Sequence, residues 1–202
     1  MGNCHARCEP GESGENCKAS SDRYLSVLRI TSDGRKLGLD QRIINPMLPD
    51  EPETKVNKCV SNILKIWKEG DTEKLTQLVF CDIATPSGKP NDGSEDAPFT
   101  NIYDDIRRKL ISGGMAPEQV AFIHSAKTDI QKKELFAKVR SGQVRVLIGS
   151  TQKMGAGTNV QDRLIALHDL DCPWHPRDVG RILRTFKIKK KVEVTDNGKD
   201  DF

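Results

Sequence analysis

The sequence predicts an α/β fold, in which a parallel sheet is flanked by helices. Between residues 75 and 186, apolar runs typical of buried strands alternate with segments typical of amphipathic helices. Parallel strands need a long crossover connection, usually a helix, so this alternation favours a parallel sheet covered on both faces. The 36% hydrophobic content supports a buried core but not one along the whole length. We therefore expect one domain with flexible N- and C-terminal tails.

The strands of this sheet are predicted from short apolar runs. Leu75–Ala84 (LTQLVFCDIA) is apolar almost throughout and contains an acidic residue near its end, which is typical of a strand buried on both faces. Gln119–Ser125, Val144–Gly149 and Leu164–Leu170 have a similar character. These segments form the predicted sheet.

Helices are predicted where apolar residues recur at three- and four-residue steps. Glu53–Gly70 has such a face and ends at a glycine, and Ile102–Ser112 is followed by two more glycines. Thr128–Arg140 begins with T-D-I-Q, the pattern of a capping box. A last helix is expected at about Arg177–Phe186.

The N-terminal part has a different character. Its first residues are polar, Gly-rich and aperiodic, which predicts a flexible leader. Tyr24–Thr31 alternates apolar and polar residues as a half-buried strand does, Ser32–Gly34 is predicted as a turn, and residues 35–52 as an ordered loop. The chain is thus divided into a leader (1–22), a strand and helix leading into the domain (23–74), the α/β domain (75–186) and a charged tail (187–202).

Cysteine usage and hydropathy limit the possible environments. The cysteines at 59, 81 and 172 lie in apolar runs, as buried cysteines do. Cys4, His5, Cys8 and Cys17 do not have the spacing of the usual zinc sites, so disorder is favoured over metal binding. No apolar run approaches the roughly 18 residues of a membrane span, and no signal-peptide pattern is present. We expect no membrane partner and a cytoplasmic location.

Positive charge is modest overall but locally clustered. The net charge of +3 does not by itself indicate a nucleic-acid partner. Arg107–Lys109 and Lys187–Lys191 are basic clusters that could contact phosphates, although a solvated charged face is the commoner explanation.

Three segments after predicted strands carry suggestive residues, because ligands of parallel sheets bind at the carboxyl ends of strands. Ser150–Asn159 (STQKMGAGTN) combines hydroxyls and amides with glycines that let the backbone pass close to a ligand. Asp169–Pro176 (DLDCPWHP) contains Trp174, which either closes the core edge or lies against nucleic acid. Gly180–Arg184 places two arginines on one helix face, suited to phosphate recognition or simply solvated.

In this order, the three segments resemble motifs V and VI of the second RecA-like domain of superfamily-2, Swi/Snf-type DNA helicases. Leu78–Asp82 (LVFCD) resembles the strand that opens that domain, Ala121–Ser125 (AFIHS) its next strand, and Lys133–Val139 the following helix. The resemblance spans about residues 23–186 and points to bacterial and mobile-element helicases, some of them joined to DNA methyltransferases. It implies a RecA-like fold and the second lobe of an ATP-dependent DNA helicase or translocase.

The resemblance also implies roles for individual residues. Arg181 and Arg184 match the motif VI arginines, so they are expected to be catalytic arginine fingers that reach the γ-phosphate of ATP. The residues expected to shape the motif V loop and couple it to the nucleotide are Gly155, Gly157, Thr158, Asn159 and Asp162. Those expected to contact DNA are His124, Ser125, Ser150, Thr151, Lys153 and Trp174. For His124, a hydrogen-bonded core histidine is an equal alternative.

The chain departs from the family in two places. Motif VI usually has the form Q-R-x-G-R-x-x-R, whereas here Asp178-Val179 runs directly into Gly180-Arg181. About four residues are missing, close to one helical turn of about 5.4 Å. There is also no G-x-x-x-x-G-K-[ST] loop and no D-E-x-H-like segment. ATP and Mg²⁺ would therefore be shared with a separate N-terminal RecA-like domain or chain, and DNA is the other expected partner.

Two further hypotheses remain open. In the first, the chain is a non-catalytic module that binds nucleic acid or another partner. In the second, it is an inactive fragment of a disrupted helicase gene. Salt-sensitive DNA binding without ATP dependence would favour the module. The shortened motif VI and the unmatched leader and tail favour the fragment, whereas an adjacent reading frame with a Walker loop would count against it.

Overall fold

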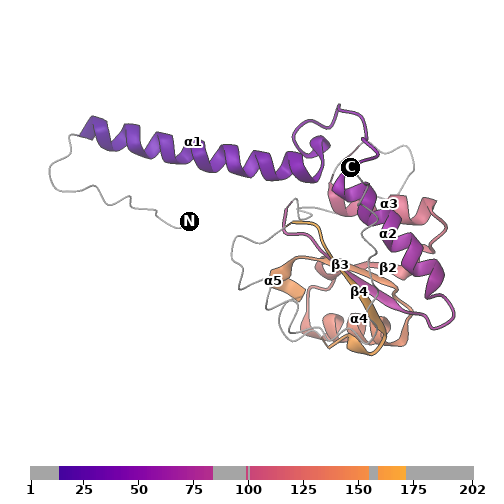
Figure 1. Ribbon diagram of the computed structural model, residues 1–202. Helices are drawn as coiled ribbons and strands as arrows, with labels where there is room; N and C mark the ends of the chain where they lie inside the picture. Colours follow the sequence, from indigo (N-terminus) through magenta and orange to yellow (C-terminus); the bar gives the residue numbers. More distant parts are fainter. Residues whose placement is uncertain (1–13, 84–98, 100, 155–158, 172–202) are drawn as a thin grey trace, which may run out of the picture.

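The computed structural model describes residues 14–83, 99, 101–154 and 159–171, with side chains from residue 27 onward. In this part of the chain, four strands form one parallel sheet with the order β2-β3-β1-β4 (Figure 1). The strands are β1 (Thr76–Phe80), β2 (Val120–Phe122), β3 (Val146–Gly149) and β4 (Leu164–Asp169).

Helices cover both faces of the sheet. On one face, α2 (Lys55–Glu69) and α3 (Ile102–Ser112) pack against strand side chains such as Val79 and Ile148. On the other, α4 (Asp129–Ser141) and α5 (Thr151–Met154) pack against Leu78 and its neighbours. Because side chains alternate along a strand, β1 contributes to both cores and is buried along its whole length. The predicted class, an α/β RecA-like parallel sheet flanked by helices, is confirmed.

Local capping signals explain where the helices begin and end. The side chains of Thr54 and Asn101 accept hydrogen bonds from the first turns of α2 and α3, and Gly70 caps the end of α2. Thr128 opens α4 with a complete capping box, which confirms the prediction for this helix. Gly142 ends α4 with φ of 78°, a left-handed conformation that favours glycine. The three predicted helices match α2, α3 and α4 to within about two residues.

The prediction for the N-terminal part is wrong. Tyr24–Thr31 and the turn expected at Ser32–Gly34 both lie within one helix, α1 (Gly14–Leu39), which also includes the end of the predicted leader. An isolated strand needs a neighbour for its backbone hydrogen bonds, whereas a helix satisfies most of them internally. The segment from residue 35 to 52 is also partly helical, because α1 continues to Leu39 and the 3-10 turn η1 (Gln41–Ile43) follows.

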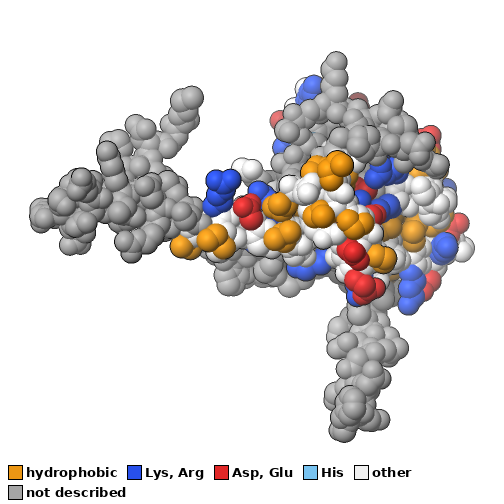
Figure 2. All heavy atoms as spheres, turned by 90° about the horizontal axis from the view of Figure 1, so that it is seen from above, with side chains coloured by type: hydrophobic (Ala, Val, Ile, Leu, Met, Phe, Trp, Pro, Cys, Tyr) orange, Lys and Arg blue, Asp and Glu red, His pale blue; other side chains and the backbone are white. Residues whose placement is uncertain are grey.

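Helix α1 extends away from the sheet and joins the rest of the molecule at its C-terminal end (Figure 1). There Leu39 is buried in the core beside α2. Figure 2 shows apolar side chains exposed along α1. The exposed apolar residues of α1 and the segment after it include Val27, Ile30 and Met47. None of the helices described is long and apolar enough to cross a membrane.

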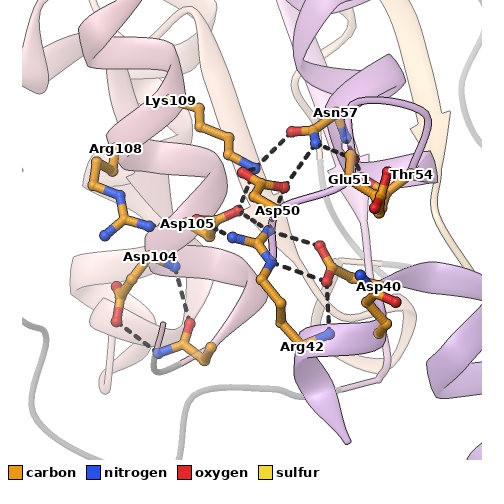
Figure 3. A network of polar contacts seen from close by, with 12 residues as sticks. Asp40, Arg42, Asp50, Glu51, Thr54, Asn57, Asp104, Asp105, Arg108 and Lys109 are labelled. Atoms are coloured by element: carbon orange, nitrogen blue, oxygen red, sulfur yellow. Dashed lines mark hydrogen bonds and ion pairs between the residues drawn. The ribbon is translucent and has the colours of Figure 1, made fainter. Parts of the chain in front are cut away.

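A buried network of charges attaches the segment after α1 to α3 (Figure 3). Arg42 Nη2 lies 2.7 Å from Asp40 Oδ2 and 2.8 Å from Asp105 Oδ2. Lys109 Nζ lies 2.8 Å from the same oxygen of Asp105, and Arg108 pairs with the other oxygen. Burial alone would raise the pKa of Asp105, but hydrogen bonds and charges from Lys109 and Arg42 outweigh it and lower the pKa.

This network corrects the interpretation of the basic cluster at residues 107–109. Arg108 and Lys109 are neither a solvated charged face nor an open phosphate-binding patch, because both pair with the buried carboxylate of Asp105. Two predicted buried cysteines, Cys59 and Cys81, are confirmed as core residues. The helix expected at about residues 177–186, the charged tail and Cys172 lie outside the described residues.

Candidate functional site

The four parallel strands end at one edge of the sheet, and polar residues follow each strand there. We call the residues at and just after the four strand ends the carboxyl edge. It places together five residues predicted to contact DNA and adds carboxylates that were not predicted. Its members are Asp82, Ile83, His124, Ser125, Ser150, Thr151, Lys153, Asp169 and Asp171.

The ends of β2 and β3 approach each other closely. A Cβ atom at Gly149 would lie 2.3 Å from Ile123 Cγ2 and 3.0 Å from Met154 Sδ. Glycine is therefore required where the 3-10 turn η3 (Ile123–Ser125) packs against α5. This contact brings His124 near Lys153, although the two residues are far apart in sequence.

His124 is a half-buried ring whose surroundings disfavour its charged form. Tyr103 packs edge-on against it, with 5.4 Å between the ring centroids. Burial lowers the pKa of His124, the charge of Lys153 lowers it further, and Asp82 opposes them. Among the described residues, its buried Nδ1 has no hydrogen-bond partner.

Thr151 presents a second buried polar atom at the same edge. Its backbone N–H donates to Asp82 Oδ1 at 2.7 Å. Its side-chain Oγ1 is buried and lacks a partner in the part of the chain that the structure describes. Buried hydroxyls are normally hydrogen-bonded, so Thr151 is suited to an oxygen-rich ligand group.

The neighbouring serines have mainly structural contacts. The carbonyl of Ser150 accepts hydrogen bonds from Lys153 N at 3.1 Å and Met154 N at 3.0 Å, which starts α5. Ser125 Oγ donates to Phe122 O at 2.6 Å and closes η3. This turn explains why β2 ends at Phe122, earlier than the predicted strand. The side chain of Lys153 is exposed and adds a positive charge.

Carboxylates link the ends of three strands. Both oxygens of the buried Asp171 accept from Asp82 N, at 2.9 and 2.8 Å, and Oδ2 also accepts from Ile83 N at 2.6 Å. Burial raises the pKa of Asp171, the charge of Asp82 adds to this, and the backbone N–H groups and Arg35 oppose it. Burial and the charges of Asp171 and Asp82 raise the pKa of Asp169 to about 6.

Sequence reasoning missed these carboxylates as site residues. A signal was present, since Asp82 ends the first apolar strand run and Asp169-Leu170-Asp171 ends the last. Acidic residues directly after adjacent buried strands are expected to meet at one edge of a parallel sheet.

Two residues expected to couple the motif V loop to the nucleotide lie elsewhere. Asp162 is in the 3-10 turn η4 (Gln161–Arg163), which precedes β4 and therefore lies at the opposite, amino edge of the sheet. The carbonyl of Asn159 accepts from Arg140 Nη1 at 2.8 Å, at the end of α4. The structure does not bring Asp162 to the carboxyl edge, and its role stays a prediction.

The remaining predicted site residues fall outside the described part of the chain. The leader residues Cys4, His5 and Cys8 considered for zinc also lie outside it. Within the described residues, no group of His, Cys, Asp and Glu side chains has a metal-binding arrangement. The site residues concerned are Gly155, Gly157, Thr158, Trp174, Arg181 and Arg184.

Comparison with protein-family models, curated proteins and solved structures gave no match. The carboxyl edge must therefore be interpreted from its own chemistry. His124, Thr151 and Lys153 offer a neutral ring, a hydroxyl and a positive charge. Such groups suit the oxygens of a phosphate backbone. The carboxylates of Asp171 and Asp82 already accept hydrogen bonds from backbone N–H groups of the protein itself.

Proposed function

We propose that this chain is the second RecA-like lobe of an ATP-dependent DNA helicase or translocase. The observation that carries the proposal is the gathering of His124, Thr151 and Lys153 at the ends of adjacent strands. Two of these residues have buried polar atoms without partners in the described structure, and the third is cationic. The resemblance of the surrounding segments to motifs V and VI supports the same function.

The carboxyl edge fits a DNA backbone. Lys153, whose side chain is exposed, would neutralise a phosphate. The Thr151 hydroxyl and His124 Nδ1 are buried, and they would form hydrogen bonds to phosphate or sugar oxygens once DNA binding exposes them. Ser125 already donates its hydroxyl proton to Phe122, so its oxygen can only accept. These contacts carry no base sequence information, which suits a motor that moves along DNA of any sequence.

The nucleotide requires residues beyond this edge. ATP hydrolysis would supply the free energy for movement, and Arg181 and Arg184 would stabilise negative charge on the phosphates. Asp171 uses both carboxylate oxygens within the protein, so it fits a structural role better than a Mg²⁺ ligand. The Mg²⁺ ligands are expected from the first RecA-like lobe.

DNA-stimulated ATPase activity tests the proposal. The chain would be assayed alone and mixed with a matching first RecA-like domain. We expect activity only in the mixture, and its loss on Arg184→Ala, since one arginine finger contributes at least about a thousandfold to the rate. Arg29→Ala, which removes an exposed positive charge from α1, is the matched control and should keep full activity. A folded chain that gives no activity in the mixture would refute the proposal.

A binding module without catalysis is the second candidate, because the phosphate-binding groups of the carboxyl edge all lie within this one domain. Fluorescence anisotropy with labelled single-stranded and duplex DNA would test it across a salt series. Lys153→Ala should weaken binding for all sequences and lower the salt slope by about one. DNA binding with an inactive mixture would favour the module, whereas a folded chain with neither property would favour an inactive fragment.

A further inference from the structure

We infer that Asp171 and Asp82 are positioning residues that couple the DNA side of the motor to its nucleotide side. Together they form a carboxylate tie, defined by their side chains and the backbone N–H groups of Asp82, Ile83 and Thr151. This coupling role rests on the function proposed above, whereas the tie itself is a property of this chain alone.

The tie crosses three adjacent strands. Asp171 follows β4 and holds the backbone after β1 through Asp82 N and Ile83 N, at 2.6 to 2.9 Å. Asp82 follows β1 and holds the start of α5 through Thr151 N, at 2.7 Å. The strand order places β1 between β4 and β3, so the two bonds run in series across the edge. Bonds from a carboxylate to backbone N–H groups are short and strong.

The two ends of the tie serve different predicted contacts. Thr151 and Lys153, at one end, belong to the proposed DNA surface. The segment that begins after Asp171, at the other end, carries Arg181 and Arg184 in the sequence. The tie therefore fixes the starting points of the DNA-contacting and the nucleotide-contacting segments relative to each other. Its loss should reduce coupling more than it reduces DNA binding.

The hydrogen bonds predict which substitutions are tolerated. Asp82 accepts the Thr151 N–H through Oδ1, and an asparagine retains such an acceptor. Asp171 uses both oxygens as acceptors, so an asparagine would turn its own N–H₂ group toward a backbone donor. We expect Asp82→Asn to be tolerated, and Asp82→Ala and Asp171→Asn to break the tie. A role based on charge alone would make Asn and Ala equivalent at position 82.

Amide hydrogen exchange followed by NMR tests the tie in the chain alone. Asp171→Asn should speed exchange at Asp82 and Ile83 by about tenfold or more, since these N–H groups lose a charged acceptor. Asp82→Ala should do the same at Thr151, whereas Asp82→Asn should stay within about twofold of wild type. Asp129→Asn, at a 91% exposed carboxylate on α4, is the control. Urea unfolding would separate local opening from global loss of stability. Equal exchange in Asp82→Asn and Asp82→Ala, or unchanged exchange in Asp171→Asn, would overturn the tie.

ATPase and DNA-binding assays of the same variants test the coupling. In the mixture with the first lobe, Asp171→Asn and Asp82→Ala should lower the maximal rate at saturating DNA by about tenfold or more, with DNA affinity within about twofold. Asp82→Asn should keep the wild-type rate. Parallel loss of rate and affinity would overturn the coupling role. An inactive wild-type mixture would overturn the proposed function. The hydrogen-exchange pattern would still show whether the carboxylate tie is present.

Discussion

Removing the carboxylate of Asp105 should destabilise the fold strongly. Its side chain is 1% exposed and contacts Arg42, Arg108 and Lys109, so Asp105→Asn leaves buried or half-buried cations without their shared partner. Breaking a buried ion pair costs about 3–5 kcal/mol. Arg42 and Lys109 keep Asp50, and Arg42 also keeps Asp40, so the expected loss is about 2–3 kcal/mol.

Urea unfolding followed by circular dichroism measures this loss, with Asp129→Asn as the matched control. Asp129 also pairs with a lysine three residues later but is 91% exposed, so its change should stay below about 0.5 kcal/mol. Because the folded state lowers the pKa of Asp105, its stabilisation is present above the unfolded pKa and is lost as pH falls through the folded value. The two proteins should therefore converge in strong acid. A loss below about 1 kcal/mol at neutral pH would refute the reasoning.

Three further predictions concern two titratable side chains and one glycine. Burial lowers the pKa of His168 from 6.5 to about 4, so the folded state favours the neutral ring. The free energy of unfolding is therefore highest above pH 6.5 and decreases as the pH falls from 6.5 toward 4. Wild type should lose about 2 kcal/mol relative to His168→Gln between pH 7 and pH 5 in urea unfolding. Since the pKa of Asp169 is raised to about 6, its charge destabilises the fold above that pH. Asp169→Asn should therefore raise the free energy of unfolding, measured by urea unfolding, at pH 8 but not at pH 4, by less than about 1 kcal/mol because the group is exposed to solvent. Gly142→Ala should lower stability by about 1–3 kcal/mol, and by more than Gly114→Ala, since both have positive φ but only at Gly142 would a Cβ approach another residue, Lys74 O at 2.8 Å.

The parts of the fold that were predicted correctly depend on local signals. Thr128 and Gln131 form a capping box within four residues, and Gly142 lies directly after α4, so the sequence alone locates that helix. Strand β1 was predicted because both of its faces are buried, which leaves a continuous apolar run. In each case the interactions that determine the element involve residues that are close in the sequence or that are all buried.

The errors arise where contacts between residues far apart in the sequence determine the structure. The alternation at Tyr24–Thr31 fits a strand only if a neighbouring strand is available, and the structure forms α1 there. Arg108 and Lys109 pair with Asp105, which lies only three and four residues earlier, but Asp105 is buried against Arg42, 63 residues away in the sequence. Periodicity within a short window carries no information about such partners.

The candidate site was predicted in part for a similar reason. The parallel-sheet rule places residues after strands at one edge, where the structure brings together Thr151 and His124, the second of which was predicted from the resemblance alone. The same rule would have placed Asp162 at the other edge, because it precedes β4. The hydrogen bond from Asp82 N to Asp171 spans 89 residues, and its geometry required the structure.

The two groups of carboxylates differ in a way that bears on function. Asp105 is surrounded by cations that lower its pKa, which is what stability alone would favour. Asp171 instead accepts hydrogen bonds from backbone N–H groups, and its pKa is raised despite the opposing charge of Arg35. The pKa of Asp169 is raised as well. The carboxyl edge therefore carries electrostatic strain that the fold avoids around Asp105. Perturbed ionisable groups concentrate at functional sites, so this strain favours the carboxyl edge as the working edge of the domain.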